Sequence, residues 1–160
     1  MGHYPPLFLV VAAGLAAFPY AFSWFVWASV TLVSYIAVVQ RLFRKDTVIL
    51  AAIGFPAILI NFLHGQNGFV IAALFAGALL CMRSKPLLAG VLIGLMAFKP
   101  QFGVLIPFAL LAGGFYRTFA AATLTVLLTC AATVLLFGEH TWLAFFESTQ
   151  ATRHQVLESG

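Results

Sequence analysis

Two long uncharged runs, Tyr20–Gln40 and Thr118–Phe137, constrain the fold of this chain more than any other feature. Each run has the length of about 20 mainly apolar residues that a bilayer-spanning helix needs. Hydrophobic residues make up 63% of the sequence and charged residues only 8%, whereas a soluble domain has about 25% charged residues. A soluble fold would leave apolar faces that it could not cover. The sequence therefore predicts an all-α integral membrane protein, with residues 1–160 forming a single membrane domain.

Several shorter apolar runs accompany the two long ones. Prolines end or interrupt some of them: Pro19 follows the first run, and Pro56 lies inside a later one, where it should kink the helix or free a backbone carbonyl. We therefore expect a polytopic transmembrane helix bundle of about six or seven segments, several of them short or broken. The shorter runs are Leu7–Phe18, Thr47–Leu63, Phe69–Met82, Leu87–Phe98 and Phe102–Ala112.

Basic residues between the apolar runs predict how the chain is oriented in a membrane. Cytoplasmic loops carry an excess of Lys and Arg, and the clusters Arg41–Lys45, Arg83–Lys85 and Arg117 alternate correctly if all three are cytoplasmic. The net charge of +4 reflects these short clusters, so we predict no nucleic-acid partner. The opposite, extracytoplasmic side then holds His64–Gly68, Lys99–Gln101 and the C-terminal tail.

Two segments near the ends of the chain need separate interpretations. The run Leu7–Phe18 is either a re-entrant piece that dips in from the extracytoplasmic side or a short span that places Tyr4 inside. Residues 139–160 are mostly polar, but Trp142 and its Leu and Phe neighbours favour an amphipathic segment on the membrane surface. We therefore predict an extracytoplasmic amphipathic tail over residues 139–160.

Lys99 is a lone cation that follows twelve uncharged residues and precedes Pro100 and Gln101. No acidic residue occurs between Asp46 and Glu139, so nothing nearby in the sequence neutralises this charge. Proline disfavours helical dihedrals in the residue before it and suits the first turn of a helix. A lysine beside a helix N-terminus is suited to hold a phosphate, so Lys99 and Gln101 are candidate contacts of an anionic ligand. The alternative is an interfacial lysine that snorkels into water.

The run His64-Gly65-Gln66-Asn67-Gly68 is a second candidate binding element. Its imidazole and two amides can form hydrogen bonds with sugar hydroxyls or phosphate oxygens, and its glycines permit close backbone approach. The alternative is a polar turn between helices, with Asn67 capping the following helix. The orientation argument favours a binding role, because it places this turn and Lys99 on one side.

Other patterns are weaker or point away from a function class. The spacing Gly90-x-x-x-Gly94 lets helices approach closely, but it is common in apolar helices and we predict no dimer from it. No His or Cys pair has the spacing of metal ligands, so we predict neither a metal nor a cofactor. Ser/His/Asp catalysis has no support, because Asp46 lies in a predicted cytoplasmic loop.

Three short motifs follow one another along the chain: His64-Gly65-Gln66-Asn67, Pro86-Leu87-Leu88-Ala89-Gly90 and Lys99-Pro100. Together with Tyr4-Pro5-Pro6 and the span Trp24–Arg41, their order and spacing resemble the core of glycosyltransferase family 87. The resemblance covers roughly residues 4 to 150. It implies a polytopic fold of the GT-C class and a membrane glycosyltransferase activity of the hexosyl- or mannosyltransferase type.

The resemblance also implies a reaction and a set of partners. A polyprenyl-phosphate-linked sugar would be the donor and a lipid or glycan the acceptor, on the extracytoplasmic side of a bacterial-type inner membrane. Transfer would be an inverting displacement at the anomeric carbon, with little or no need for a metal and with a carboxylate as general base. Lys99 and Gln101 would contact the donor phosphate. His64, Gln66 and Asn67 would contact sugar or phosphate.

The resemblance leaves the catalytic residue unassigned. In the family, the proposed catalytic aspartate lies in an extracytoplasmic loop that would precede Tyr4. We therefore expect this chain to be a central fragment of such an enzyme. Two other function classes stay open: a transporter or flippase of an anionic lipid, since broken helices beside a cation also suit transport, and a non-catalytic membrane scaffold. Polar residues at the midplane of several helices would favour transport.

Overall fold

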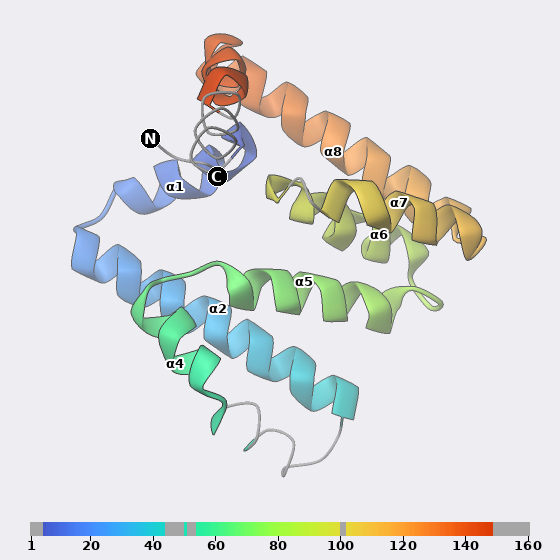
Figure 1. Ribbon diagram of the computed structural model, residues 1–160, viewed down its shortest axis with the longest axis horizontal. Coiled ribbons are helices and arrows are strands. Elements are labelled where there is room, and N and C mark those ends of the chain that lie inside the picture. Colours follow the sequence, from blue (N-terminus) through green and yellow to red (C-terminus); the bar gives the residue numbers. More distant parts are fainter. Residues whose placement is uncertain (1–4, 44–49, 51–53, 100–101, 149–160) are drawn as a thin grey trace, which may run out of the picture.

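The computed structural model describes residues 5–43, 50, 54–99 and 102–148. Every regular element within these residues is a helix, which confirms the predicted all-α fold (Figure 1). The elements are the 3₁₀ helices η1 (Pro6–Phe8) and η2 (Met96–Phe98), the α-helices α1 (Leu9–Ala16), α2 (Tyr20–Phe43), α4 (Pro56–Leu63), α5 (Gly68–Cys81), α6 (Pro86–Leu95), α7 (Phe102–Ala112) and α8 (Tyr116–Phe137), and a helix of residues 140–148.

Fewer helices are long enough to cross a bilayer than we predicted from the sequence. Helices α2 and α8, with 24 and 22 residues, are both long and apolar enough. Helices α4 and α5 add a third span only if they count as one broken helix, because they are bent by 118° relative to each other. The expected six or seven segments therefore correspond to two or three candidate spans in the described part of the chain. The reason is that turns divide the other apolar runs into helices of 8 to 14 residues.

Pro56 is the first residue of α4, and the helical conformation is interrupted just before it, at Phe55. Phe55 before it is extended, with φ −72° and ψ 125°, as is usual for a residue that precedes proline. Proline suits the first turn of a helix because its missing N–H would have no partner there. Most of the rest of the predicted run Thr47–Leu63, residues 47–49 and 51–53, lies outside the described residues.

Two glycines allow α6 to pack closely against α8. A Cβ on Gly90 would lie 2.5 Å from the carbonyl oxygen of Thr118 and 2.5 Å from the Cβ of Ala121. A Cβ on Gly94 would lie 2.8 Å from the carbonyl oxygen of Ala122. Small residues at this spacing let helix backbones approach each other. The Gly-x-x-x-Gly pattern therefore serves a contact within the chain.

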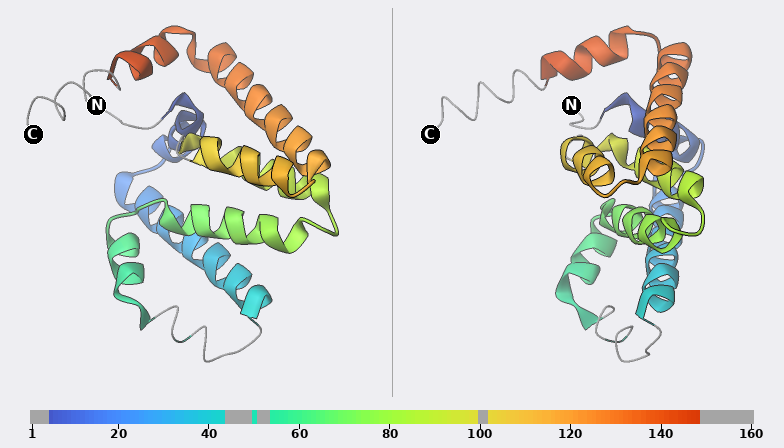
Figure 2. Two further views of the ribbon diagram at one scale, coloured as in Figure 1. Left: turned by 45° about the vertical axis from the view of Figure 1, so that its right-hand side comes forward. Right: turned by 90° about the vertical axis from the view of Figure 1, so that its right-hand side faces the viewer.

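The glycine contacts also make α6 and α8 parallel. Gly90 meets Thr118, and Gly94, one turn later in α6, meets Thr125, two turns later in α8. Helix α7 connects α6 to α8 along the chain and runs in the opposite direction. Helix α2 contacts α5, α5 contacts α6, and α6 contacts α8, so these four helices adjoin one another in that order (Figure 2).

The two ends of this row of helices differ in charge. Arg41 closes α2, Lys85 precedes α6 and Arg117 lies in the first turn of α8. Arg41 lines one groove, Lys85 and Arg117 line another, and Leu88 lines both grooves. We call this the basic end. The opposite end, which we call the turn end, holds the turn between α4 and α5 and the end of α6 (Figure 1).

The first apolar run begins and ends beside the first two turns of α2. The ring centroids of Phe8 in η1 and Trp27 in α2 are 5.8 Å apart. The hydroxyl of Ser23, one turn before Trp27, donates to the carbonyl oxygen of Leu15 at 2.7 Å. These contacts hold the run Pro6–Ala16 against the first two turns of α2; whether it is a re-entrant piece or a short span stays a prediction.

The glycine contact between α6 and α8 predicts a selective loss of stability. We expect Gly90→Ala to lower the melting temperature, because overpacking typically costs about 1–3 kcal/mol. Gly77→Ala is the matched control: its new Cβ would lie 3.4 Å from Leu92, an ordinary contact, and alanine favours helices. Thermal unfolding in detergent, followed by circular dichroism, measures both variants. Equal melting temperatures for the two variants would contradict the packing described here.

Candidate functional site

Two side chains hold the turn between α4 and α5. Trp27 Nε1 donates to the carbonyl oxygen of Gly65 at 3.1 Å, which links the turn to α2. The side-chain amide of Asn61 donates to the carbonyl oxygen of Gln66 at 3.4 Å. Gly65 has a φ of +58°, a left-handed conformation that glycine adopts without steric cost. The turn is therefore a fixed structure and positions its own polar side chains.

Asn61, not Asn67, caps α5. Asn67 occupies the N-cap position, but its side chain makes no capping hydrogen bond. The amide of Gly68 donates instead to Oδ1 of Asn61, at 3.2 Å. The sequence left open whether Asn67 caps the helix or binds a ligand, and the capping role belongs to Asn61. The sequence did not lead us to predict Asn61 as the cap, although it is a lone amide in the apolar run just before the turn.

The side-chain oxygen of Asn67 has no hydrogen-bond partner among the described residues. The residue is 3% exposed, and its buried Oδ1 accepts no hydrogen bond within the described residues. An unsatisfied buried polar group costs about 1–3 kcal/mol of stability. A hydroxyl or amine donor brought by a ligand would remove that cost.

Lys99 lies between η2 and α7, where the chain leaves the helical conformation. It is half-buried, with φ −117° and ψ 97°, the extended range usual before proline. Its backbone amide donates to Met96 and its carbonyl oxygen accepts from Phe102, so its backbone is fixed. The acidic residues of the described segments, Glu139 and Glu147, follow the C-terminal end of α8, and neither forms an ion pair with Lys99.

Aromatic contacts connect the turn to Lys99. Trp27, which binds Gly65, packs edge-on against Phe8 at a centroid distance of 5.8 Å. Phe8 in turn packs against Phe98, also at 5.8 Å, and Lys99 follows Phe98 directly. The turn and Lys99 are therefore both at the turn end. Phe8 and Phe98 were missed from the sequence because nothing distinguishes them among seventeen Phe residues.

The same three rings, Phe8, Trp27 and Phe98, line an apolar cavity of about 380 Å³. Residues of α1, α5, α6 and α8 complete its walls, including Thr133 in α8. The Thr133 hydroxyl donates to the carbonyl oxygen of Cys130 and accepts a bond from Trp142, which ties the helix of residues 140–148 to this end. The cavity falls within the size range of about 300–1,000 Å³ typical of ligand pockets.

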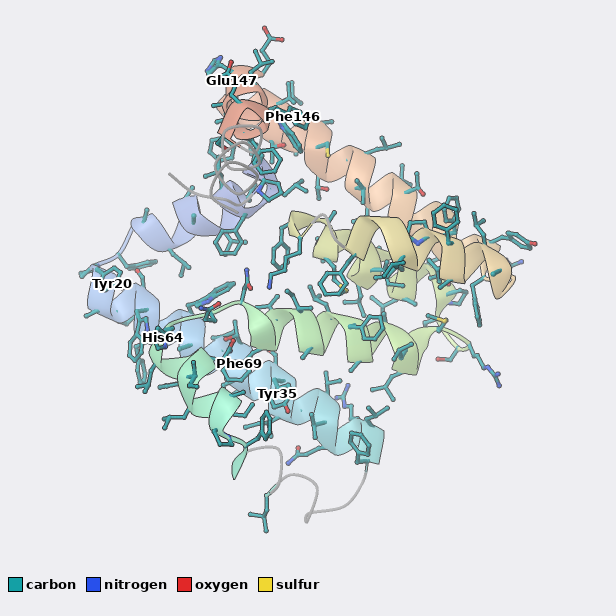
Figure 3. All side chains as sticks on the ribbon, viewed as in Figure 1. Tyr20, Tyr35, His64, Phe69, Phe146 and Glu147 are labelled. Atoms are coloured by element: carbon teal, nitrogen blue, oxygen red, sulfur yellow. The ribbon has the colours of Figure 1, made fainter. Side chains whose placement is uncertain are left out.

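The remaining candidates have different positions. His64 is exposed at the end of α4, beside the first turns of α2 (Figure 3). Its Nδ1 lies 2.9 Å from the carbonyl oxygen of Ile60, a bond that requires the proton on Nδ1 and leaves Nε2 as an acceptor. The side chain of Gln66 is exposed. Gln101 lies outside the described residues.

Removing the indole donor of Trp27 should loosen the turn. We expect Trp27→Phe to speed hydrogen exchange at the amides of Gly65 and Gln66 about fivefold, because a hydrogen bond contributes about 1 kcal/mol. Trp24→Phe is the control of equal size, since the Trp24 ring lies against Gly65 and Phe62 but forms no hydrogen bond to the turn within the described residues. Hydrogen exchange read by mass spectrometry compares the two. Equal protection of the turn in both variants would rule out the Trp27 bond as its support.

Comparison of the sequence with known proteins identifies the family of this chain. The family model described as Glycosyltransferase family 87 matches residues 3–160. No curated protein and no solved structure gives a significant match to the chain. The family match spans the apolar helices, the turn and Lys99 together. Because the match covers nearly the whole sequence, this protein belongs to glycosyltransferase family 87, a family of membrane glycosyltransferases.

Proposed function

We propose that the turn end binds a polyprenyl-phosphate-linked hexose and that the protein takes part in transferring this hexose, for example mannose, to a lipid or glycan acceptor. The single observation that carries the proposal is the half-buried Lys99, which has no acidic partner among the described residues, beside an apolar cavity and an amide-bearing turn. The family match supports glycosyl transfer in general. The nature of the donor rests on the chemistry of these groups.

Lys99 is suited to the charge that develops during transfer. Cleavage of the bond between the anomeric carbon and the phosphate oxygen turns a phosphodiester into a phosphomonoester, which carries more negative charge. An ammonium at that oxygen therefore stabilises the transition state more than the bound donor, which is the requirement for catalysis. The same ammonium holds the phosphate before reaction. In this proposal Gln101 adds a second contact to the phosphate.

The polar turn supplies contacts for the sugar. The orphaned Oδ1 of Asn67 accepts a bond from a sugar hydroxyl, which would satisfy a buried acceptor. Gln66 is exposed and offers a second amide, and His64 offers Nε2 as an acceptor. We assign no catalytic base among the described residues.

The apolar cavity fits the lipid part of the donor. Its aromatic wall continues directly into the segment that carries Lys99. A prenyl chain in this cavity would place its terminal phosphate near the ammonium. Burial of the chain contributes about 25 cal/mol per Å² of apolar surface, so the lipid would provide much of the affinity.

The charge distribution supports an extracytoplasmic turn end. Arg41, Lys85 and Arg117 gather at the basic end, and basic ends of membrane helices face the cytoplasm. In this proposal the protein is a multi-pass protein of a bacterial-type inner membrane, and transfer takes place on its outer side.

Three threonine hydroxyls of α8 weigh against the alternative of a transporter or flippase. Transport would favour polar groups available at the midplane of several helices. Thr125, Thr129 and Thr133 instead donate to carbonyl oxygens of their own helix. Their hydroxyls serve the helix and not a translocation path.

Removing the charge of Lys99 should impair donor use. We expect Lys99→Gln to lower kcat/KM for a polyprenyl-phosphate hexose by about 10- to 100-fold, since a bond to a charged group contributes about 1.5–3 kcal/mol. Lys99→Arg should retain more activity, because it keeps the charge. Transfer is measured in membranes with radiolabelled donor, and donor binding is measured separately in detergent. Arg83→Gln, an equal loss of charge at the basic end, is the control. Wild-type transfer and binding in Lys99→Gln would remove Lys99 from the site.

The proposed orientation predicts which positions can be labelled from outside the cell. In a Cys81→Ala/Cys130→Ala background, cysteines at positions 66 and 99 should react with a membrane-impermeant maleimide in intact cells. A cysteine at position 85, at the basic end, should react only after the membrane is opened. Labelling of positions 66 and 99 from opposite sides would contradict the site itself. Labelling of both from the cytoplasm would contradict its outer location.

A further inference from the structure

The basic end contains a second candidate binding site, away from the turn end. Lys85 and Arg117 line one groove of about 610 Å³, together with Pro86, Leu87 and Leu88. Both cations are exposed, and their chain positions are more than thirty residues apart. The groove thus brings together two basic residues, one just before α6 and one in the first turn of α8.

The parallel arrangement of α6 and α8 explains why these two cations meet. Gly90 contacts Thr118 at the start of both helices. Lys85 immediately precedes α6, and Arg117 immediately precedes Thr118. The close glycine contact therefore fixes the spacing of the two charges, and the apolar side chains of Leu87 and Leu88 line the groove with them.

A second groove adjoins the first. It has a volume of about 730 Å³ and is lined mainly by apolar residues of α2, α5 and α6, with Arg41 at the end of α2. Leu88 lines both grooves, so they are neighbours. Together they offer one groove with two cations and an adjoining, mainly apolar groove that also carries Arg41.

The charges at this end are unopposed within the described residues. The acidic residues of the described segments, Glu139 and Glu147, follow the opposite end of α8, where Figure 3 shows Glu147. Two cations beside a mainly apolar groove complement a molecule with an anionic head and a hydrocarbon tail. Basic pockets between membrane helices on the cytoplasmic side suit lipid phosphates for this reason.

We propose that the basic end binds one anionic phospholipid. Its phosphate sits between Lys85 and Arg117, and one acyl chain lies in the apolar groove between α2, α5 and α6. This lipid is distinct from the glycosyl donor, because its site is at the opposite end of the bundle. It would connect the ends of three helices, α2, α6 and α8.

Native mass spectrometry of the detergent-purified chain tests this proposal with phosphatidylglycerol and phosphatidylcholine as probes. We expect phosphatidylglycerol to be retained more strongly than phosphatidylcholine. Lys85→Gln/Arg117→Gln should weaken that binding about 25-fold, because each basic residue near anionic lipid contributes about 1 kcal/mol, a factor of about five. Arg83→Gln is the control: Arg83 is exposed in the same turn as Lys85 but is not among the lining residues of the groove.

Several results would overturn the proposal. These are equal retention of the two lipids, unchanged phosphatidylglycerol binding in the double variant, or an equal loss in Arg83→Gln. Competition by glycerol 3-phosphate as effective as that by phosphatidylglycerol would show a site for free phosphate and not for a lipid. Lys85→Arg/Arg117→Lys keeps both charges and should retain binding, which separates loss of charge from loss of folding.

Discussion

The close, parallel contact of α6 with α8 is the interaction on which the rest of the structure depends. Gly90 and Gly94 bring the two backbones together over two turns, with no large side chain between them. This contact fixes where both helices start, and so where Lys85 and Arg117 lie. It also fixes where α6 ends, and so where Lys99 lies. One apolar contact thereby positions the charged groups at both ends of the bundle.

The sequence allowed prediction of the features that depend on local composition. The uncharged runs predicted helices α2 and α8, because a helix of that length must bury its apolar surface in lipid. Proline at position 100 predicted a helix break at Lys99, since the preceding residue avoids helical dihedrals. The basic clusters predicted that Arg41, Lys85 and Arg117 share one end. The number of spans was overestimated, because apolar composition alone does not give the length of each helix.

Features that depend on tertiary contacts were not predictable in this way. Asn61 and Asn67 are both amides near the same turn. Only the folded backbone shows that Asn61 caps α5 and that Oδ1 of Asn67 has no partner in the described part of the chain. The role of Phe8 likewise follows from its contacts with Trp27 and Phe98, which are far from it in sequence. The polar candidates for the site could be chosen from residue type, but the aromatic wall that joins them could not.

The shortness of α6 and α7 has a consequence for the surrounding lipid. Helix α7 has 11 residues, which corresponds to a length of about 17 Å, against a hydrocarbon thickness of about 30 Å. A bilayer adapts to short hydrophobic segments by becoming locally thinner. Beside these helices the two leaflets would therefore lie closer together than elsewhere around the protein. An amphiphile that diffuses laterally to this region would have its headgroup lowered toward the level of Lys99 by the shape of the membrane itself.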